Sequence, residues 1–174
     1  MTGSQVESVR FVAVGRDDPL AEPLLAELAV EYSSRYSVTE EGTAAWLRSH
    51  PAHEFAEPDG ALLIGLLDGV PVTGGAFQRF DADTAELKRI WTASGHRQRG
   101  YATALLAELE ALAAERGYRR VYLTTGDRQP EAEALYESAG YTRLTDSLPA
   151  EQGERSDGGE QRDVFPIAFQ KVLT

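Results

Sequence analysis

The sequence RQRGYA at residues 97–102 stands where an extended pattern, residues 85–92, gives way to a strongly helical pattern, residues 103–116. A helix that begins here offers unpaired backbone N–H groups and the positive end of its dipole to an anion. Gly100 lets the backbone approach a ligand closely, and the two arginines of the stretch add positive charge. These features predict a phosphate-binding turn between a strand and a helix, and therefore a phosphorylated cofactor.

Two widespread nucleotide-binding patterns are absent from the chain. The absence of G-x-x-x-x-G-K-S/T argues against an NTPase. The absence of G-x-G-x-x-G argues against a dinucleotide-binding Rossmann unit. The details of the turn must therefore indicate which phosphorylated cofactor it holds.

The turn resembles the pyrophosphate loop of the GNAT superfamily of acyl-CoA-dependent N-acetyltransferases. That loop reads Q/R-x-x-G-x-G/A, and the first, fourth and sixth residues of the stretch match it. A second segment, AEALYESAGY at residues 132–141, is similar to the family's A-x-x-L-Y-x-x-x-G-F, with Tyr141 in place of Phe. Because both motifs occur in order and at the family's spacing, the resemblance is close over residues 85–141.

Hydrophobic patterning predicts a three-stranded meander followed by a crossover. The apolar runs at residues 61–67 and 70–80 flank Asp68-Gly69, which is a hairpin signal, and residues 84–92 follow as a third strand. The helix at 103–116 and the strand at 121–125 predict a right-handed crossover and a parallel pair of strands. The other expected elements are helices at 19–32, 39–48 and 130–140, with Gly117 and Gly140 as helix ends, and strands at 7–14, 141–144 and 164–172.

We therefore expect one α/β domain over residues 1–174. The resemblance implies a GNAT-like acyl-CoA N-acyltransferase fold, in which helices flank a mixed central sheet whose parallel strands splay apart for the pantetheine arm. The motif-bearing core spans about residues 84–142. Residues 145–163 contain six acidic and two basic side chains, a composition typical of a loop; alternatively, this segment is a lid over the acceptor site.

The composition excludes several kinds of chemistry. The chain has no cysteine, so disulfides, zinc–thiolate sites and an acyl-cysteine intermediate are impossible. The three histidines, at positions 50, 53 and 96, lack metal-site spacing, and we expect no metal. The net charge of -11 disfavours nucleic acid as a partner. It mildly favours a cationic acceptor such as an amine, although it is equally explained by solubility alone.

The sequence also carries no sign of membrane targeting. The first ten residues are polar and lack the apolar region of a signal peptide. No apolar run approaches the roughly 18 residues of a membrane span. These features favour a cytoplasmic protein without a membrane partner.

Acyl transfer from a thioester to an amine requires proton removal from the ammonium, stabilisation of the carbonyl oxygen and departure of the thiolate. The resemblance implies that Tyr136 is the acid, because the family's matching tyrosine points at the CoA sulfur. In the alternative interpretation, Tyr136 packs its ring into the core. Glu86 precedes Arg97 by eleven residues, and some family members carry a catalytic glutamate at this spacing. Burial in a cleft can raise the pKa of such a base; alternatively, Glu86 pairs with Lys88 or Arg89 on a sheet face.

The resemblance also implies the cofactor contacts. It places an oxyanion donor among the backbone N–H groups near Trp91 or Thr92, where the family's strand bulges. In the alternative interpretations, Trp91 only packs and Arg99 is only solvated. Gln129 stands where the family often has Asn, and a longer side chain caps a helix less well. The full set of expected acetyl-CoA contacts is Ile90, Trp91, Thr92, Arg97, Gln98, Arg99, Gly100, Tyr101, Ala102, Thr103, Gln129 and Tyr136.

The sequence thus predicts an N-acetyltransferase that transfers an acetyl group from acetyl-CoA to a primary amine of a small molecule or peptide by direct attack in a ternary complex. Three alternatives stay open: a non-catalytic acyl-CoA sensor, an enzyme for longer acyl groups with a wider cleft near Ile90 and Leu123, and a protein N-terminal or lysine acetyltransferase. A homodimer is plausible if residues 164–172 form an exposed edge strand. The resemblance nominates Tyr32, Arg35, Tyr36 and Phe80 for the acceptor site.

Overall fold

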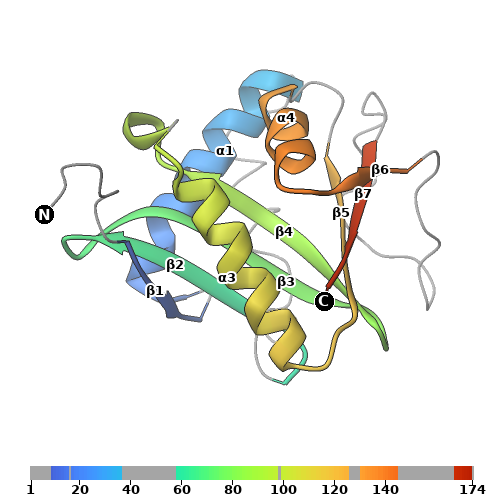
Figure 1. The fold of residues 1–174 in the computed structure, drawn as a ribbon. Helices are drawn as coiled ribbons and strands as arrows, with labels where there is room; N and C mark the ends of the chain where they lie inside the picture. Colours follow the sequence, from blue (N-terminus) through green and yellow to red (C-terminus); the bar gives the residue numbers. More distant parts are fainter. Residues whose placement is uncertain are drawn as a thin grey trace, which may run out of the picture.

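A mixed sheet forms the centre of the protein, with helices on both of its faces (Figure 1). The computed structural model describes residues 9–15, 17–36, 58–97, 99–125, 130–144 and 167–173. In these residues the sheet has seven strands in the order β1-β2-β3-β4-β5-β7-β6. The strands are β1 (Arg10–Ala13), β2 (Ala61–Leu67), β3 (Val70–Asp81), β4 (Thr84–Thr92), β5 (Arg120–Thr125), β6 (Thr142–Arg143) and β7 (Ile167–Val172).

The helices follow the predicted pattern closely. They are η1 (Pro19–Ala21), α1 (Glu22–Tyr36), η3 (Ser94–His96), α3 (Tyr101–Glu115) and α4 (Pro130–Ser138). Helix α3 begins two residues earlier than the apolar periodicity predicted, directly after Gly100. The helix predicted at 39–48 and the charged segment at 145–163 lie outside the described residues.

The Asp68-Gly69 turn joins β2 and β3 as an antiparallel hairpin, as predicted. Asp68 and Gly69 have φ angles of 51° and 79°, and Leu67 pairs with Val70 across the turn. Two consecutive positive φ angles are typical of a type I′ turn, whose twist matches that of the flanking strands.

Strands β4 and β5 are parallel for a short distance only. Their pairing runs from Thr84 opposite Arg120 to Glu86 opposite Tyr122. Although both strands are described in full, no pair joins them beyond that point, and the two ribbons diverge (Figure 1). The predicted splayed parallel strands are therefore confirmed, and they place Glu86 where the separation begins.

Alternate residues of the strands supply two apolar layers. On β2, Leu63 belongs to the cluster that contains Leu105 and Leu109 of α3. Its neighbour Ile64 belongs to the cluster that contains Leu24 of α1. Because successive strand side chains point to opposite faces, α3 and α1 cover opposite sides of the sheet.

Helices α3 and α4 end in the same way, at the glycines that the sequence indicated. Gly117 and Gly140 have φ angles of 98° and 95°. After Gly140, the N–H of Tyr141 donates to the carbonyl of Tyr136 at 3.0 Å. After Gly117, the N–H of Tyr118 donates to the carbonyl five residues earlier, that of Ala113, at 3.1 Å. These bonds define Schellman motifs, in which a left-handed glycine reverses the chain.

The exposed edge at residues 164–172, which was the condition for a dimer, is contradicted over the part that the structure describes, residues 167–172. Strand β7 pairs with β5 along all six of its residues, from Ile167 opposite Thr125 to Val172 opposite Arg120. On its other side it pairs with β6, where Arg143 lies opposite Phe169. In the described part of the sheet the edges are β1 and β6. The argument for a dimer through an exposed β7 edge is therefore removed.

Candidate active site

The turn before α3 presents an open helix N-terminus. Gly100 adopts the left-handed conformation, with φ 83° and ψ 4°, and no described side chain caps the helix. The first turn of α3 contains no acidic residue, and a Cβ built on Gly100 would meet nothing within 4 Å. A helix start without a side-chain cap suits an anion, and the space beside Gly100 is open.

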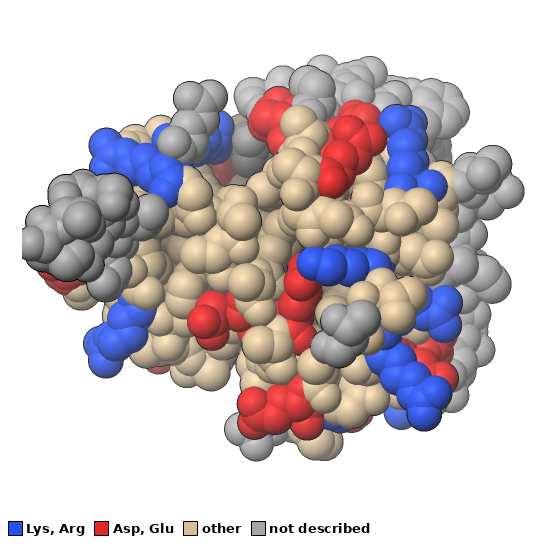
Figure 2. All heavy atoms as spheres, viewed as in Figure 1, with Lys and Arg blue, Asp and Glu red and all other residues tan. Residues whose placement is uncertain are grey.

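The turn carries two basic side chains, Arg97 and Arg99. Arg97 and Arg99 are exposed, and Figure 2 shows basic side chains over the region where η3 leads into α3. The guanidinium Nε of Arg97 donates to the carbonyl of Thr92 at 3.4 Å, which joins the turn to the end of β4. In a chain of net charge -11, this local positive charge favours a phosphate group.

Six of the twelve predicted cofactor residues lie in this turn and at the start of α3, namely Arg97, Arg99, Gly100, Tyr101, Ala102 and Thr103. Ala102 is half-buried and Thr103 is exposed, so both can face a ligand. Tyr101 is 2% exposed, and its ring lies 6.3 Å from that of His96; it can therefore contribute only its backbone. Gln98 and Gln129 lie outside the described residues.

Strand β4 bulges just before Trp91, beside the position that the resemblance implied. Gly74 pairs with Trp91 and Ala76 pairs with Lys88, so two residues, Arg89 and Ile90, face one on β3. Arg89 has a φ of 59°, and a non-glycine residue there indicates a local constraint. Gly75 is the residue opposite, and it has no side chain; a Cβ built on it would lie 2.6 Å from Ile90 Cδ1. The bulge therefore forms where β3 leaves room for Ile90.

Trp91 packs its side chain on the α1 side of the sheet. It is 3% exposed and belongs to the α1 cluster. Its indole Nε1 donates to Glu27 Oε1 at 3.0 Å, and its carbonyl accepts a 2.7 Å hydrogen bond from Thr73 Oγ1. The interpretation of Trp91 as a packing residue is supported for the side chain, while its backbone remains beside the bulge.

Glu86 is a buried carboxylate at the point where β4 and β5 separate. It is 4% exposed. Gln78 Nε2 donates to its Oε1 at 3.1 Å, and Lys88 Nζ lies 3.7 Å from its Oε2. The ion pair with Lys88 is the contact that the alternative interpretation expected.

Tyr136 lies in the core on the α3 side of the sheet. It is 6% exposed, and its ring centroid is 5.8 Å from that of Tyr141 and 5.7 Å from that of Phe169. Glu86 points to the opposite face, because its neighbours Ala85 and Leu87 belong to the same cluster as Tyr136. The two predicted catalytic residues therefore lie on opposite sides of the sheet, near its divergent strands.

The acceptor residues are only partly placed. Tyr32, Arg35 and Tyr36 belong to the second half of α1, and their side chains lie outside the described residues. Phe80 is 5% exposed, with its ring 4.8 Å from that of Tyr122. Phe80 packs in a small cluster with Tyr122 and Ala168, and its role as an acceptor contact stays a prediction.

Sequence reasoning missed Glu27, which supports the site from α1. Its Oε1 accepts both the Trp91 indole N–H and, at 3.1 Å, the backbone N–H of Ser94. No local spacing links Glu27 to residues 64 and 67 positions later. An acidic residue on the apolar side of a predicted helix was the only available signal.

Neither a metal-ligand cluster nor a membrane-spanning helix occurs in the described residues. Among the residues that the structure describes, no three His, Cys, Asp or Glu side chains are grouped to hold a metal ion. In the same part of the chain, no helix has both the length and the apolar character needed to cross a membrane.

The sequence matches a family model described as the acetyltransferase (GNAT) family over residues 25–141. The chain belongs to the GNAT acetyltransferase family. It is 33% identical to mouse "Probable N-acetyltransferase family 8 member 5" over 101 residues, which are 58% of this chain and 43% of the relative. It is 30% identical to human N-acetyltransferase 8 over 86 residues, which are 49% of this chain and 37% of the relative. The matched region of this chain thus covers less than half the length of each of these relatives.

Solved GNAT structures share the whole fold. An acetyltransferase of the GNAT family from Staphylococcus aureus has a TM-score of 0.72 at 14% identity, with 96% of this chain and 100% of that chain covered. The PaiA N-acetyltransferase from Thermoplasma acidophilum, solved in complex with coenzyme A, has a TM-score of 0.69 at 16% identity, with 95% and 99% covered. At these identities the likeness establishes the fold alone, and it confirms the predicted GNAT architecture.

Proposed function

We propose that this GNAT protein transfers an acetyl group from acetyl-CoA to a primary amine of a small molecule or peptide, by direct attack in a ternary complex. The observation that carries the proposal is the uncapped N-terminus of α3 at Gly100, with a left-handed glycine and open space before it. It lies beyond a strand, β4, that has already separated from β5. A phosphate anchor beside divergent strands suits a long ligand with a phosphate group at one end.

The residues present suit acetyl-CoA. The backbone N–H groups of residues 100–103 would hold the pyrophosphate, with Arg97 and Arg99 adding charge. The bulged end of β4, at Ile90 to Thr92, would face the thioester, and Gln98 and Gln129 are further proposed contacts. Two solved neighbours support this assignment, because the Thermoplasma enzyme contains coenzyme A and a Salmonella typhimurium acetyltransferase, with a TM-score of 0.63 and 16% identity, contains acetyl-CoA.

The chemistry that follows is a single transfer. The acceptor nitrogen attacks the thioester carbonyl carbon, a C–N bond forms, and the C–S bond breaks. The ammonium proton passes to Glu86, directly or through water, because Glu86 is a buried carboxylate at the point of strand separation. Tyr136 donates its hydroxyl proton to the departing thiolate, and the second proton, which the nitrogen loses as the amide forms, restores the Tyr136 hydroxyl through water. Backbone N–H groups at the β4 bulge stabilise the oxyanion.

The first test is calorimetry with acetyl-CoA on three proteins. Gly100→Glu adds a negative charge and a Cβ at a left-handed position in the proposed phosphate site. Gly69→Glu is the matched control: Gly69 also has a positive φ, of 79°, and open space around it, but it lies in the β2–β3 turn. Binding by the wild type and Gly69→Glu, together with its loss in Gly100→Glu, supports the cofactor assignment.

The second test measures turnover. Free-thiol release from acetyl-CoA is followed across a panel of primary amines and peptides. Release that depends on one class of amine supports an N-acetyltransferase. Binding without release for any amine favours an acyl-CoA sensor, whereas absence of binding by the wild type overturns the proposed function.

A further inference from the structure

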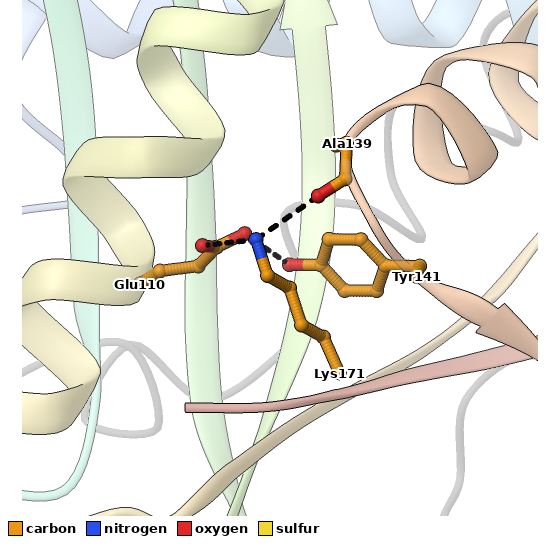
Figure 3. A network of polar contacts seen from close by, with 4 residues as sticks. All are labelled: Glu110, Ala139, Tyr141 and Lys171. Atoms are coloured by element: carbon orange, nitrogen blue, oxygen red, sulfur yellow. Dashed lines mark hydrogen bonds and ion pairs between the residues drawn. The ribbon is translucent and has the colours of Figure 1, made fainter. Parts of the chain in front are cut away.

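A network of polar contacts joins α3, the end of α4 and β7 (Figure 3). Lys171 Nζ lies 2.9 Å from Glu110 Oε1 and donates to the carbonyl of Ala139 at 2.9 Å. The hydroxyl of Tyr141 donates to Glu110 Oε2 at 2.9 Å. Both carboxylate oxygens therefore have a partner from a different element, and one cation serves two acceptors.

The network is sheltered from water. The Glu110 and Lys171 side chains are 14% and 30% exposed, and Tyr141 is 5% exposed. Lys171 Nζ also lies 5.6 Å from the centre of the Tyr141 ring. A sheltered ion pair is tolerated when its remaining hydrogen-bonding capacity is satisfied, and removal of one partner leaves a costly charge. The geometry of these four groups is thus tightly specified.

A single residue, Tyr141, connects the network to Tyr136. Tyr141 contacts the network through its hydroxyl and Tyr136 through its ring, at 5.8 Å. Phe169, the other ring beside Tyr136 at 5.7 Å, lies two residues before Lys171 on β7 and thus on the same face of that strand. The Tyr141 and Phe169 rings beside Tyr136 therefore both belong to segments that the network joins.

The other end of the network is α3. Glu110 lies on the helix whose N-terminus forms the turn at Gly100, while Ala139 and Tyr141 lie at the end of the helix that carries Tyr136. The network is consequently a direct polar link between the helix of the phosphate turn and the helix of the proposed acid.

We propose that Glu110, Lys171 and Tyr141 are positioning residues that set the place of the Tyr136 hydroxyl relative to α3, and so to the sulfur of a thioester anchored at the start of that helix. This inference rests on the proposed function. It assigns the network a part in thiolate departure, which depends on the hydroxyl position, rather than in cofactor affinity. A misplacement of about 1 Å at a reacting group can cost about 100-fold in rate.

The test is a double-mutant cycle on kcat and on KM for acetyl-CoA. Lys171→Met removes the cation in the wild-type and Tyr136→Phe backgrounds, and Lys171→Arg is the conservative variant. Arg143→Met is the matched control, because Arg143 and Glu133 form an ion pair at 3.4 Å that also ties β6 to α4 but is more exposed, at 54% and 21%. Thermal unfolding of each variant reports its stability.

Lys171→Met is expected to lower kcat about 10-fold or more in the otherwise wild-type protein, with little change in KM. In the Tyr136→Phe background the same substitution should lower kcat less than about 2-fold. Lys171→Arg, which keeps the cation, should retain most of the wild-type kcat. Arg143→Met should leave kcat within about 2-fold. An equal fall of kcat in both backgrounds would show a purely structural role and overturn the proposal. Tyr141→Phe, which removes one hydroxyl, gives the same cycle if Lys171→Met does not fold.

Two further outcomes distinguish the positioning role of the network from the proposed acetyltransferase function. If the wild type turns over and Tyr136→Phe retains the full kcat, Tyr136 is not the acid and the positioning role is overturned while the acetyltransferase assignment stands. If the wild type neither binds acetyl-CoA nor releases thiol, the proposed function is overturned and the positioning role with it.

Discussion

The indole Nε1 of Trp91 donates a 3.0 Å hydrogen bond to Glu27 Oε1. The same oxygen accepts the backbone N–H of Ser94 at 3.1 Å. One carboxylate of α1 therefore holds the end of β4 and the start of η3, the two segments that lead to the turn at Gly100. Because Trp91 is only 3% exposed, water cannot readily replace this partner of the indole.

Glu27→Ala is expected to lower the free energy of unfolding by about 1–3 kcal/mol, because it leaves a buried N–H without a partner. Glu27→Gln is the matched control, since its amide oxygen can still accept. Urea denaturation followed by circular dichroism measures both. Equal losses in the two variants would contradict the hydrogen-bonding role and point to side-chain packing.

Gly75→Ala should disturb the β4 bulge. The added Cβ would lie 2.6 Å from Ile90 Cδ1, and overpacking of this kind costs about 1–3 kcal/mol. Ile90→Val removes the clashing atom, so the double variant should recover part of the stability lost in Gly75→Ala. Gly95→Ala, where a Cβ meets nothing within 4 Å, is the control. Strict additivity of the two changes in a denaturation cycle would rule out direct contact.

Glu86→Gln should retain the fold and lose turnover. The amide oxygen can still accept from Gln78 Nε2, which now bonds Oε1 at 3.1 Å, but it cannot accept a proton from the ammonium. Loss of a general base typically costs about 100- to 10,000-fold in rate. Steady-state kinetics and acetyl-CoA calorimetry on the same protein separate the two effects. Full activity in Glu86→Gln would assign proton removal to water and leave Glu86 as a partner of Lys88.

The stability of the protein should fall at alkaline pH partly through Tyr141. Burial, and then the charge and hydrogen bond of Glu110, raise the pKa of Tyr141 above its usual value of 10.0. The unfolded chain loses this proton near pH 10 while the folded chain keeps it, so the unfolded state binds fewer protons and stability decreases with pH. The contribution is fully present below about pH 10 and is lost as the pH rises above it.

Tyr141→Phe therefore should show a shallower decline of unfolding free energy than the wild type between about pH 9.5 and pH 11. The measurement is a series of urea titrations at constant ionic strength. Parallel curves for the two proteins would mean that Tyr141 titrates alike in the folded and unfolded states, contrary to its burial beside Glu110.

The sequence predicted those parts of the fold that depend on local chemistry. Asp68-Gly69 formed the expected hairpin because Asp and Gly tolerate the two positive φ angles that a type I′ turn requires. Gly117 and Gly140 ended their helices for a similar reason. The parallel pairing of β4 with β5 followed from the strand–helix–strand order.

What the sequence did not predict depends on pairs of residues far apart in the chain. Glu27 and Trp91 are 64 positions apart, and neither residue type implies the other. The insertion of β7 between β5 and β6 depends on which strand edges meet in space, and the predicted edge at β7 was therefore wrong. The bulge opposite Gly75 likewise depends on the register of two strands.

The two Schellman motifs have a consequence for cooperativity. The tyrosine after each left-handed glycine reaches a distant segment: Tyr118 donates to the carbonyl of Asp59 at 2.7 Å, and Tyr141 donates to Glu110. Chain reversal and long-range docking are thereby coupled in the same residue at both helix ends. The C-terminus of α3 or of α4 cannot fray without breaking one of these long-range contacts. Hydrogen exchange at the C-termini of α3 and α4 should therefore proceed through larger, subglobal openings of the structure.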